Sequence, residues 1–417
     1  MNQWINFEQS ITQRLTREEL DREQTRAKNF RPEGAAIIRG VAGSGKSLVL
    51  RNRAEKLLEA FDDILVLTYN RYMNGWLKSK LQEKGISKNV DCTTFHKWAW
   101  DTFKYDYNWD RKDNTRKNII KLTKNSNLKY QAILVDEAQD FYDEWFQGLL
   151  EVLDPNTDSL FIVYDNTQSI YGQPHRRKST WSWKDLGIDI PGGRSQIFDL
   201  NYRNSPEILE LAWSFIKPAL AAADMKVEKR ERDEEGRIKN TPSIGSIIEP
   251  KKKLSRSSNL QPLILEIYYE DMASQIARQV KDALNTHPES SIGILIHPQA
   301  KDLKIEISRE LNELQIDHHA PNSSGERDLN IVTRPYVVVD SWNALKGVEF
   351  DAVIIAGIDR LTENTEDRDR DFQEKAGLYT AMTRARDHLV MLYENKNSIV
   401  ELVENSLAYP SLLDSEE

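Results

Sequence analysis

The stretch Ile37-Ile-Arg-Gly-Val-Ala-Gly-Ser-Gly-Lys-Ser47 decides the fold of this 417-residue chain. It matches the pattern G-x-x-x-x-G-K-[ST], after an apolar run typical of a strand and before a helical pattern. By chance, the bare pattern would arise in a chain of this size on the order of 1% of the time. Its glycines let backbone N–H groups turn inward around phosphates. We therefore predict a triphosphate site made by Gly40, Ala42, Gly43, Ser44, Gly45, Lys46 and Ser47, with the Ser47 hydroxyl available to Mg²⁺.

Near-continuous apolar runs recur along most of the chain. They lie at residues 35–39, 64–67, 132–135, 160–163, 263–268, 292–296, 336–339, 352–355 and 389–392. Runs of this kind fit parallel strands that helices cover on both faces. The sequence therefore predicts an α/β fold with two tandem parallel-sheet domains. We place them at 1–194 and 195–417, with a small basic insertion at about 97–130 and an irregular polar stretch at about 226–260.

Composition bounds the class of protein. Hydrophobic residues make up 39% and charged residues 29%, as in a globular chain. One cysteine, Cys92, excludes an intrachain disulfide framework and a cysteine-rich zinc site. No apolar run reaches the length of a membrane span, and the first residues lack a secretory pattern. We expect a cytoplasmic protein that does not enter a membrane.

Positive charge is concentrated in two stretches although the net charge is −9. The first, Lys104 to Lys129, holds eight Lys or Arg against three Asp, with aromatic residues among them. The second contains Arg176, Arg177 and Trp181 and no acidic residue. Cations mixed with flat rings suit a single strand, since cations meet phosphates and rings stack on bases. Composition alone is equally compatible with a solvated basic face.

Acidic residues follow the apolar run at 132–135. In a P-loop sheet, Asp136 would then stand beside Mg²⁺, and Glu137 near the γ-phosphate could orient and deprotonate the attacking water. Acids at a helix N-terminus are also common for purely structural reasons. The pairing with the P-loop favours the catalytic interpretation.

Asp136-Glu-Ala-Gln-Asp140 resembles motif II of superfamily 1 helicases of the UvrD/Rep/PcrA group. Further segments resemble that family's motifs in the same order and cover nearly the whole chain. These are Gln24, Leu67-Thr-Tyr-Asn70, Thr94-Phe-His96, Asp165-Asn-Thr-Gln-Ser-Ile-Tyr171, Asn201-Tyr-Arg-Asn204, Leu345-Lys-Gly-Val-Glu-Phe350 and Tyr379-Thr-Ala-Met-Thr-Arg-Ala-Arg386.

The resemblance implies two RecA-like domains with ATP and Mg²⁺ in the cleft between them. It implies that Gln24 reads adenine, that Tyr202 stacks on it, and that Gly347 and Glu349 lie at the nucleotide. It further implies that Gln168, Arg203 and Arg384 contact or sense the γ-phosphate. Tyr69, Asn70, Thr94, His96 and Tyr171 would contact the strand. The implied activity is single-strand translocation or unwinding, on DNA with 3′→5′ polarity, with RNA also possible.

Several features depart from the family's pattern. Tyr164 stands where a glycine usually precedes the motif III aspartate, and Asn343 replaces a frequent histidine. UvrD-type enzymes carry two inserted domains. The stretch from Arg203 to Lys346 is barely long enough to complete the second core domain, so we expect the large second insertion to be absent. Compact UvrD-like proteins also serve beside nucleases, as in anti-phage systems of the Gabija kind. An ATPase subunit that gates a partner such as a nuclease is therefore the alternative. A small-molecule P-loop kinase is disfavoured because it would need only one such domain.

Overall fold

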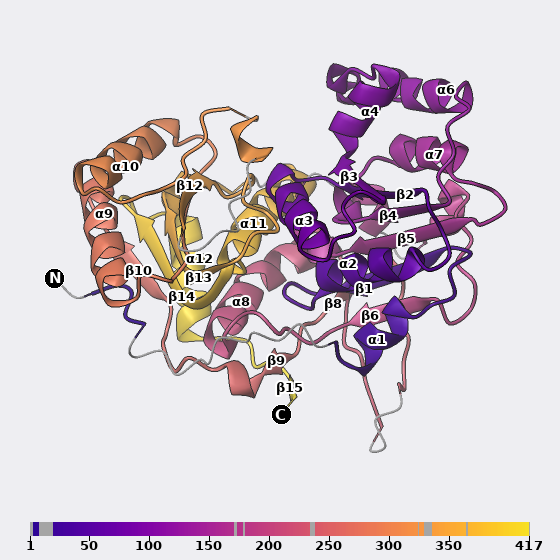
Figure 1. Ribbon diagram of the computed structural model, residues 1–417. Helices are drawn as coiled ribbons and strands as arrows, with labels where there is room; N and C mark the ends of the chain where they lie inside the picture. The colour runs from indigo at the N-terminus through magenta and orange to yellow at the C-terminus, as the bar shows by residue number, and fades with distance from the viewer. Residues whose placement is uncertain are drawn as a thin grey trace. The chain divides into compact units, whose positions relative to one another are not determined.

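The computed structural model describes residues 3–7, 20–170, 173–177, 180–233, 238–323, 325–328, 336–363 and 366–416. It divides into two compact units (Figure 1). Unit 1 contains Met1–Leu15, Leu200–Val227 and Glu249–Glu417, and unit 2 contains Thr16–Asp199 and Glu228–Ile248. The α/β class with two parallel sheets is confirmed. The division lies a few residues beyond the boundary that we expected. Residues 228–248, which we expected in the second domain, pack within unit 2.

Unit 2 is built on a parallel sheet of six strands, in the order β3-β2-β4-β5-β1-β6. The strands are β1 (Ala36–Gly40), β2 (Ile64–Thr68), β3 (Val90–Thr94), β4 (Ala132–Val135), β5 (Ser159–Tyr164) and β6 (Ser195–Phe198). Its helices are α1 (Arg22–Lys28), α2 (Lys46–Leu57), α3 (Arg71–Glu83), α4 (Phe95–Phe103), α5 (Asp113–Arg116), α6 (Asn118–Lys124) and α7 (Asp143–Val152). Because every strand runs the same way, the segments that follow the strands gather at one edge of the sheet.

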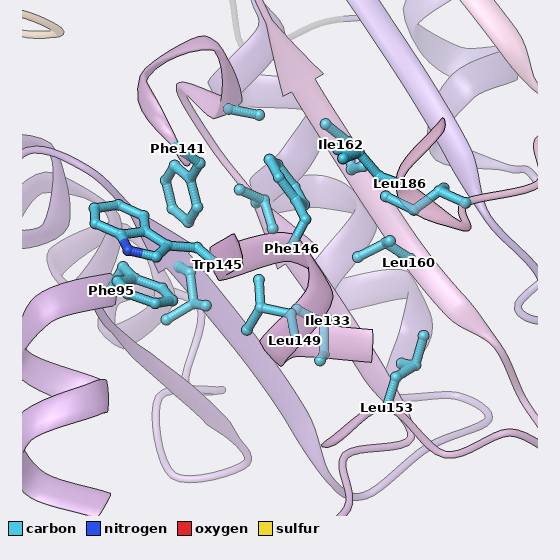
Figure 2. Close-up of a cluster of buried hydrophobic side chains, with 14 of the residues drawn as sticks. Phe95, Ile133, Phe141, Trp145, Phe146, Leu149, Leu153, Leu160, Ile162 and Leu186 are labelled. Atoms are coloured by element: carbon cyan, nitrogen blue, oxygen red, sulfur yellow. The ribbon is translucent and has the colours of Figure 1, made fainter. Parts of the chain in front are cut away.

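Alternate residues of these strands enter two separate cores. Ala36 and Ile38 of β1 pack on the face covered by α2 and α3, whereas Ile37 packs on the other face. Both faces are therefore apolar, which explains the continuous hydrophobic runs in the sequence. Figure 2 shows the second core, where Trp145 of α7 lies beside Phe95 and Phe146 of the same helix lies over the strands. The Phe95 and Trp145 rings stack with centroids 4.0 Å apart.

The basic insertion folds as a compact part of unit 2. It contains α4, η1 (Tyr107–Arg111), α5 and α6, and α6 packs against α7. Asp110 holds it together: its carboxylate accepts hydrogen bonds from the Tyr105 hydroxyl at 2.6 Å and from Trp145 Nε1 at 3.0 Å. The Arg116 guanidinium lies over the Tyr142 ring, 3.8 Å from its centroid. The insertion is thus anchored to the helix that follows the acidic segment.

Unit 1 contains a parallel sheet of five strands in the order β10-β14-β13-β11-β12. The strands are β10 (Leu263–Glu266), β11 (Ile292–Ile296), β12 (Val337–Ser341), β13 (Phe350–Ala356) and β14 (Ala385–Tyr393). The helices are α8 (Pro206–Ala222), α9 (Tyr269–Thr286), α10 (Lys301–Glu313), α11 (Arg368–Met382) and α12 (Ser398–Ala408). The N-terminal residues Trp4 and Ile5 join the core formed by α9, α10 and this sheet.

Short elements complete the two units. Unit 2 also contains η2 (Ala138–Asp140), η3 (Asn166–Gln168), η4 (Pro174–Arg177), η5 (Trp183–Leu186) and β8 (Ile247–Ile248), which pairs with β7 (Val227–Glu228). Unit 1 also contains η6 (Leu254–Arg256), η7 (Glu326–Asp328), η8 (Ile358–Arg360), and β9 (Lys252–Lys253) paired with β15 (Ser415–Glu416). None of the helices in the described ranges combines the length and apolar character needed to cross a bilayer.

Candidate nucleotide site and nucleic-acid interface

The P-loop connects β1 to α2 and needs its glycines for two different reasons. Gly43 and Gly45 have φ of 65° and 82°, a conformation that disfavours other residues. A Cβ on Gly40 would lie 2.5 Å from Ser44 Oγ, so the side of this turn has no room for one. Ala42 and Ser44 are buried in the same turn. The loop therefore has the tight glycine turns that a phosphate site requires.

Lys46 begins α2 and folds back over its own loop. Its ammonium donates to the carbonyls of Gly40 at 2.9 Å and Val41 at 2.8 Å. It also lies 3.7 Å from a carboxylate oxygen of Asp165, which follows β5. That carboxylate accepts a hydrogen bond of 2.8 Å from Gln168. The structure therefore brings Lys46 and Gln168, both predicted from the sequence, to one carboxylate.

Gln24 lies on α1 and reaches the P-loop from the side. Its amide donates to the Ser44 carbonyl at 3.0 Å, and its carbonyl accepts from the Asp21 backbone in a capping box. A Cβ on Gly45 would lie 2.6 Å from the Gln24 amide nitrogen. Gln24 is thus packed tightly against the P-loop.

Asp136 and Glu137 follow β4 and are both buried. Burial and the neighbouring Glu137 raise the pKa of Asp136 to about 7, while hydrogen bonds from Ser47 and from the Glu137 backbone oppose the shift. Glu137 has φ 53°, a left-handed conformation that is unusual for a residue with a side chain. Backbone strain of this kind is concentrated at functional sites.

The residues around Asp136 fit Mg²⁺. The Ser47 hydroxyl bonds the Asp136 carboxylate. The other oxygen of that carboxylate, Oδ2, is buried and accepts no hydrogen bond from the part of the chain that the structure describes. Mg²⁺ usually takes one or two carboxylates together with water and phosphate oxygens. One hydroxyl and one unsatisfied carboxylate oxygen beside a phosphate loop match that preference.

Gln139 and Asp165 are polar residues of this site that we did not single out from the sequence. Gln139 donates to the Glu137 carboxylate and accepts from the Asp165 backbone N–H at 3.0 Å. Asp165 joins Lys46 to Gln168, as described above. In the sequence, only their position within the motifs pointed to Gln139 and Asp165. Each of them contacts a segment that follows a different strand, and a sequence pattern does not reveal such contacts.

Unit 1 brings together a second group of predicted residues. Arg203 donates to the Glu349 carboxylate at 2.6 Å and to the Thr383 carbonyl at 3.2 Å. Arg386, which we did not predict, pairs with the same carboxylate. Burial alone would raise the pKa of the Glu349 carboxyl. The two guanidinium groups outweigh this effect and hold the pKa well below its usual range.

The remaining predicted residues of unit 1 lie in the same region of its fold. Arg384 is buried, and its guanidinium donates to the Thr380 carbonyl at 2.9 Å. Gly347 has φ 93°, which a residue with a side chain rarely adopts. The Tyr202 ring is half-buried, with Lys253 Nζ 5.0 Å from its centroid.

The early predicted strand contacts lie at the ends of β2 and β3. These strands pair in parallel with Thr68 opposite Thr94, so Tyr69, Asn70, Thr94 and His96 reach the same edge of the sheet. Asn70 and Thr94 cap α3 and α4 with their side chains. His96 lies 6.2 Å from the Tyr69 ring and bonds Asp110 through Nε2 at 2.8 Å. The side chains of Asn70 and Thr94 are thus used for helix capping, whereas those of Tyr69 and His96 are partly exposed.

The second basic stretch is not arranged on the surface that we expected. The Arg176 side chain is only 6% exposed and pairs with Asp143. Its guanidinium also lies 5.6 Å from the centroid of Trp181, which belongs to the hydrophobic core. The carboxylate at the start of α7 draws Arg176 inward, so its charge and the Trp181 ring hold the fold together. Tyr171 and the Arg177 side chain lie outside the described residues.

Two solved structures share a partial likeness with the chain. One is the C-terminal domain of a possible DNA helicase from Lactobacillus plantarum WCFS1, with a TM-score of 0.31 and 15% identity over 52% of this chain and 99% of that one. The other is arterivirus nonstructural protein 10, a helicase in complex with DNA, with a TM-score of 0.38 and 11% identity over 92% of this chain and 65% of that one.

Sequence comparison adds two matches. A probable DNA helicase II homologue of Mycoplasma capricolum subsp. capricolum is 33% identical over 96 residues, which are 21% of this chain and 12% of that protein. The chain thus aligns with only a small part of that relative. A family model described as an AAA domain matches residues 24–174. That range begins at Gln24 and includes the P-loop, the acidic segment after β4 and η3. The residues of unit 2 that we predicted for the nucleotide site therefore all lie within the part of the chain that matches an AAA domain.

Proposed function

We propose that this chain is an ATP-dependent translocase or helicase that acts on single-stranded nucleic acid, most simply DNA. The convergence of Lys46, Glu137 and Gln168 on one buried polar network carries the proposal. The network includes the P-loop, the segment after β4 and the segment after β5. A purely structural Gly turn would not require a buried ammonium beside two buried carboxylates. The helicase names of the relatives support the choice of reaction.

Each residue of unit 2 has a definite task in this proposal. The Lys46 ammonium exchanges the two loop carbonyls for phosphate oxygens when a triphosphate enters. Glu137 accepts the proton of the attacking water, and Gln139 holds its carboxylate in position. Ser47 and Asp136 would hold Mg²⁺, which offsets the negative charge of the phosphates. Gln24 would read the base, as the family resemblance implies.

In the proposed reaction, Arg203 and Arg384 of unit 1 also act on the nucleotide. They would supply cations that stabilise the charge developing on the transferred phosphoryl group. In this structure Glu349 engages Arg203, so Arg203 has to exchange that carboxylate for phosphate. Loss of the phosphate contacts after hydrolysis would then reverse the exchange, as in other nucleotide switches. The 3′→5′ polarity rests on the family resemblance alone.

A second candidate is an ATPase subunit that gates a partner, such as a nuclease, without separating a duplex itself. The observation that favours it is the compactness of the chain. Of the residues described between Arg203 and Lys346, those from Leu263 to Ser341 are largely used for β10, α9, β11, α10 and β12 of the sheet. No large inserted domain is visible in the described part of that region. Translocation needs no such domain, whereas autonomous unwinding in the UvrD group is associated with one.

The experiment that tests the proposal is an ATPase titration with single-stranded DNA, single-stranded RNA and duplex DNA. We expect single strands to raise the turnover number at least about tenfold. The Glu137→Gln variant should lose turnover by a factor of about 100 or more and still bind ATP. The Lys46→Ala variant should mainly weaken triphosphate binding. Hydrolysis that stays at its basal rate under saturating strand, without a partner, would refute translocation. Stimulation that appears only with a partner protein would favour the second candidate.

A further inference from the structure

The segment from Glu228 to Ile248, here called the excursion, interrupts unit 1 in sequence but packs within unit 2. Its described residues are 228–233 and 238–248. Nothing in the resemblance or in the matched AAA region assigns it a task. Its contacts lead to the P-loop along three separate routes.

The first route passes through Arg39, which precedes Gly40 in β1. The Arg39 side chain is buried, and burial lowers its pKa. Its guanidinium donates to the carbonyls of Ile244 at 2.7 Å, Pro242 at 2.9 Å and Ser246 at 3.2 Å. A buried cation is costly unless acceptors surround it. The excursion provides these acceptors, so it supports the residue next to the P-loop.

The second route passes through Arg230, which is 3% exposed. It donates to both oxygens of Glu23, at 2.6 and 2.8 Å, and to the Ile197 carbonyl of β6 at 2.5 Å. Burial alone would raise the pKa of Glu23, but the hydrogen bonds from Arg230 and Arg232 lower it. Glu23 precedes Gln24, whose amide bonds Ser44. Arg230 therefore fixes the helix that braces the P-loop.

The third route is apolar. Ile248 at the end of the excursion packs with Val41 of the P-loop and Ile197 of β6 in a small buried cluster. The strand that contains Ile248, β8, also contacts η3, which ends at Gln168. The excursion thus reaches the P-loop, the helix of Gln24 and the segment of Gln168 without contributing any residue to the predicted catalytic set.

We propose that the excursion holds the nucleotide site of unit 2 in its binding geometry, with Arg230 and Arg39 as positioning residues. The inference rests on the ATP site of the proposed function. A glycine-rich loop has many conformations, and binding is weakened when the loop must be ordered by the ligand itself. An external brace removes that cost before ATP arrives. Its loss should therefore reduce ATP affinity and leave the chemical step nearly unchanged.

The test replaces Arg230 in the full-length chain. For Arg230→Met we expect KM for ATP, and Kd for a fluorescent ATP analogue, to rise about tenfold, with kcat within about twofold of the wild type. Glu23→Gln should give a similar increase in Kd. The double variant should be no worse than the stronger single variant, because both changes break the same link. Arg230→Lys should be intermediate, since a Lys cannot bond both carboxylate oxygens in a fixed fork.

Arg232→Met is the matched control. Arg232 donates to the same Glu23 carboxylate at 2.7 Å, but its side chain is 31% exposed whereas that of Arg230 is 3% exposed. We expect its Kd to change less than about threefold, as for other half-exposed ion pairs.

Three outcomes would overturn the proposal. One is a folded Arg230→Met protein that binds ATP like the wild type. Another is a loss of kcat without a change in KM, which would indicate a role in the chemical step. The third is additive losses for Arg230→Met and Glu23→Gln. If Arg230→Met does not fold, Glu23→Gln decides, because Glu23 is partly exposed. ATP affinity is measured without nucleic acid, so the result stands even if strands fail to stimulate hydrolysis.

Discussion

Glu137 depends on a neighbour for its orientation. The residue has a left-handed backbone, and Gln139 bonds its carboxylate while accepting from the Asp165 backbone. A general base must stand within hydrogen-bond reach of the water that it deprotonates. The Gln139 amide thus links the position of the segment after β5 to that of Glu137, the proposed base after β4.

Replacing Gln139 tests this dependence. We expect Gln139→Ala to lower kcat about tenfold, a fraction of the full contribution of a general base, with ATP affinity nearly unchanged. Steady-state hydrolysis together with fluorescent-nucleotide binding measures the two quantities. Gln147→Ala on the nearby α7 serves as the control and should match the wild type. Equal kcat for Gln139→Ala and wild type would show that Glu137 holds its position unaided.

His388 gives unit 1 a sensitivity to mild acid. Burial lowers the pKa of His388 to about 4, with Asp351 opposing the shift and His287 adding to it. The unfolded chain takes up the proton near its ordinary pKa of about 6.5, so protonation favours unfolding as pH falls below that value. His297 behaves in the same way, with a pKa of about 4.

We expect each of these two histidines to remove about 2 kcal/mol of unfolding free energy between pH 7 and pH 5. Urea unfolding of the wild type and of His388→Phe at both pH values measures this. The variant should lose less stability than the wild type over that interval. An equal loss of unfolding free energy for the wild type and His388→Phe between pH 7 and pH 5 would contradict the role of His388.

Glu349 affects stability in a different pH range. Its lowered pKa stabilises the fold above about pH 4.5, and that contribution is lost only at lower pH.

At the scale of elements, Asp110 links the basic insertion to the sheet. The Tyr105 hydroxyl and the Trp145 indole N–H both donate to its Oδ1, and both groups are buried. His96 contacts the other oxygen. Removing this carboxylate takes the acceptor from the Trp145 N–H and leaves the Tyr105 hydroxyl to a long contact with the Arg116 carbonyl at 3.5 Å. That is more costly than losing an exposed hydrogen bond.

Asp110→Ala should therefore lower the unfolding free energy by about 3 kcal/mol, and Asp110→Asn by about 1 kcal/mol, because the amide oxygen can still accept from both donors. Denaturant unfolding followed by tryptophan fluorescence reports on Trp145. Asp113→Asn offers a control in the same insertion, since its carboxylate is 86% exposed. A loss for Asp110→Asn as large as for Asp110→Ala would mean that charge, rather than satisfied donors, dominates.

The packing of β11 against β13 leaves no room for a side chain at Gly293. A Cβ there would lie 2.5 Å from the Phe350 ring. Gly293→Ala should cost about 1 to 3 kcal/mol, the usual penalty for overpacking. Gly325→Ala in the same unit is the control, because among the described residues its Cβ would meet only Ser323 Oγ, at 3.9 Å. Differential scanning calorimetry compares the two, and equal midpoints would show that Phe350 can move aside.

Elements with strong local patterns were predictable from the sequence, and elements defined by their neighbours were not. The buried strands β1, β2, β4 and β5 lie where the apolar runs predicted. The outer strands β3 and β6 carry few apolar residues and gave no such pattern. Glycine spacing identified the P-loop directly. Burial of Arg176 against Asp143 could not be foreseen, because the partner lies on another element more than thirty residues earlier.

At the scale of the whole molecule, the chain passes from one unit to the other four times. Sequence reasoning expected a single passage, since a polar stretch with Gly and Pro gives no indication of the surface on which it packs. The consequence for folding is direct. A fragment that ends at Asp199 lacks the carbonyl groups that surround the buried guanidinium of Arg39.

We expect residues 16–199 alone to unfold without the cooperative transition of the full chain, because the fragment loses the hydrogen bonds from Arg39 and the buried contact of Ile248 with Val41 and Ile197. The same fragment with residues 228–248 attached through a flexible linker should recover cooperative unfolding and ATP affinity. Thermal melts with and without nucleotide measure both. A stable, ATP-binding 16–199 fragment would show that the excursion is dispensable.

Trp4 and Ile5 begin the chain yet complete the core of unit 1, while Arg230 and Ile248 from the later half complete unit 2. If the backbone were cut between Asp199 and Leu200, each half would keep a piece that the other needs. We therefore expect the two halves to associate when they are co-expressed, unlike the separated domains of an ordinary two-domain protein. The chain is therefore suited to expression as two fragments that fold only together.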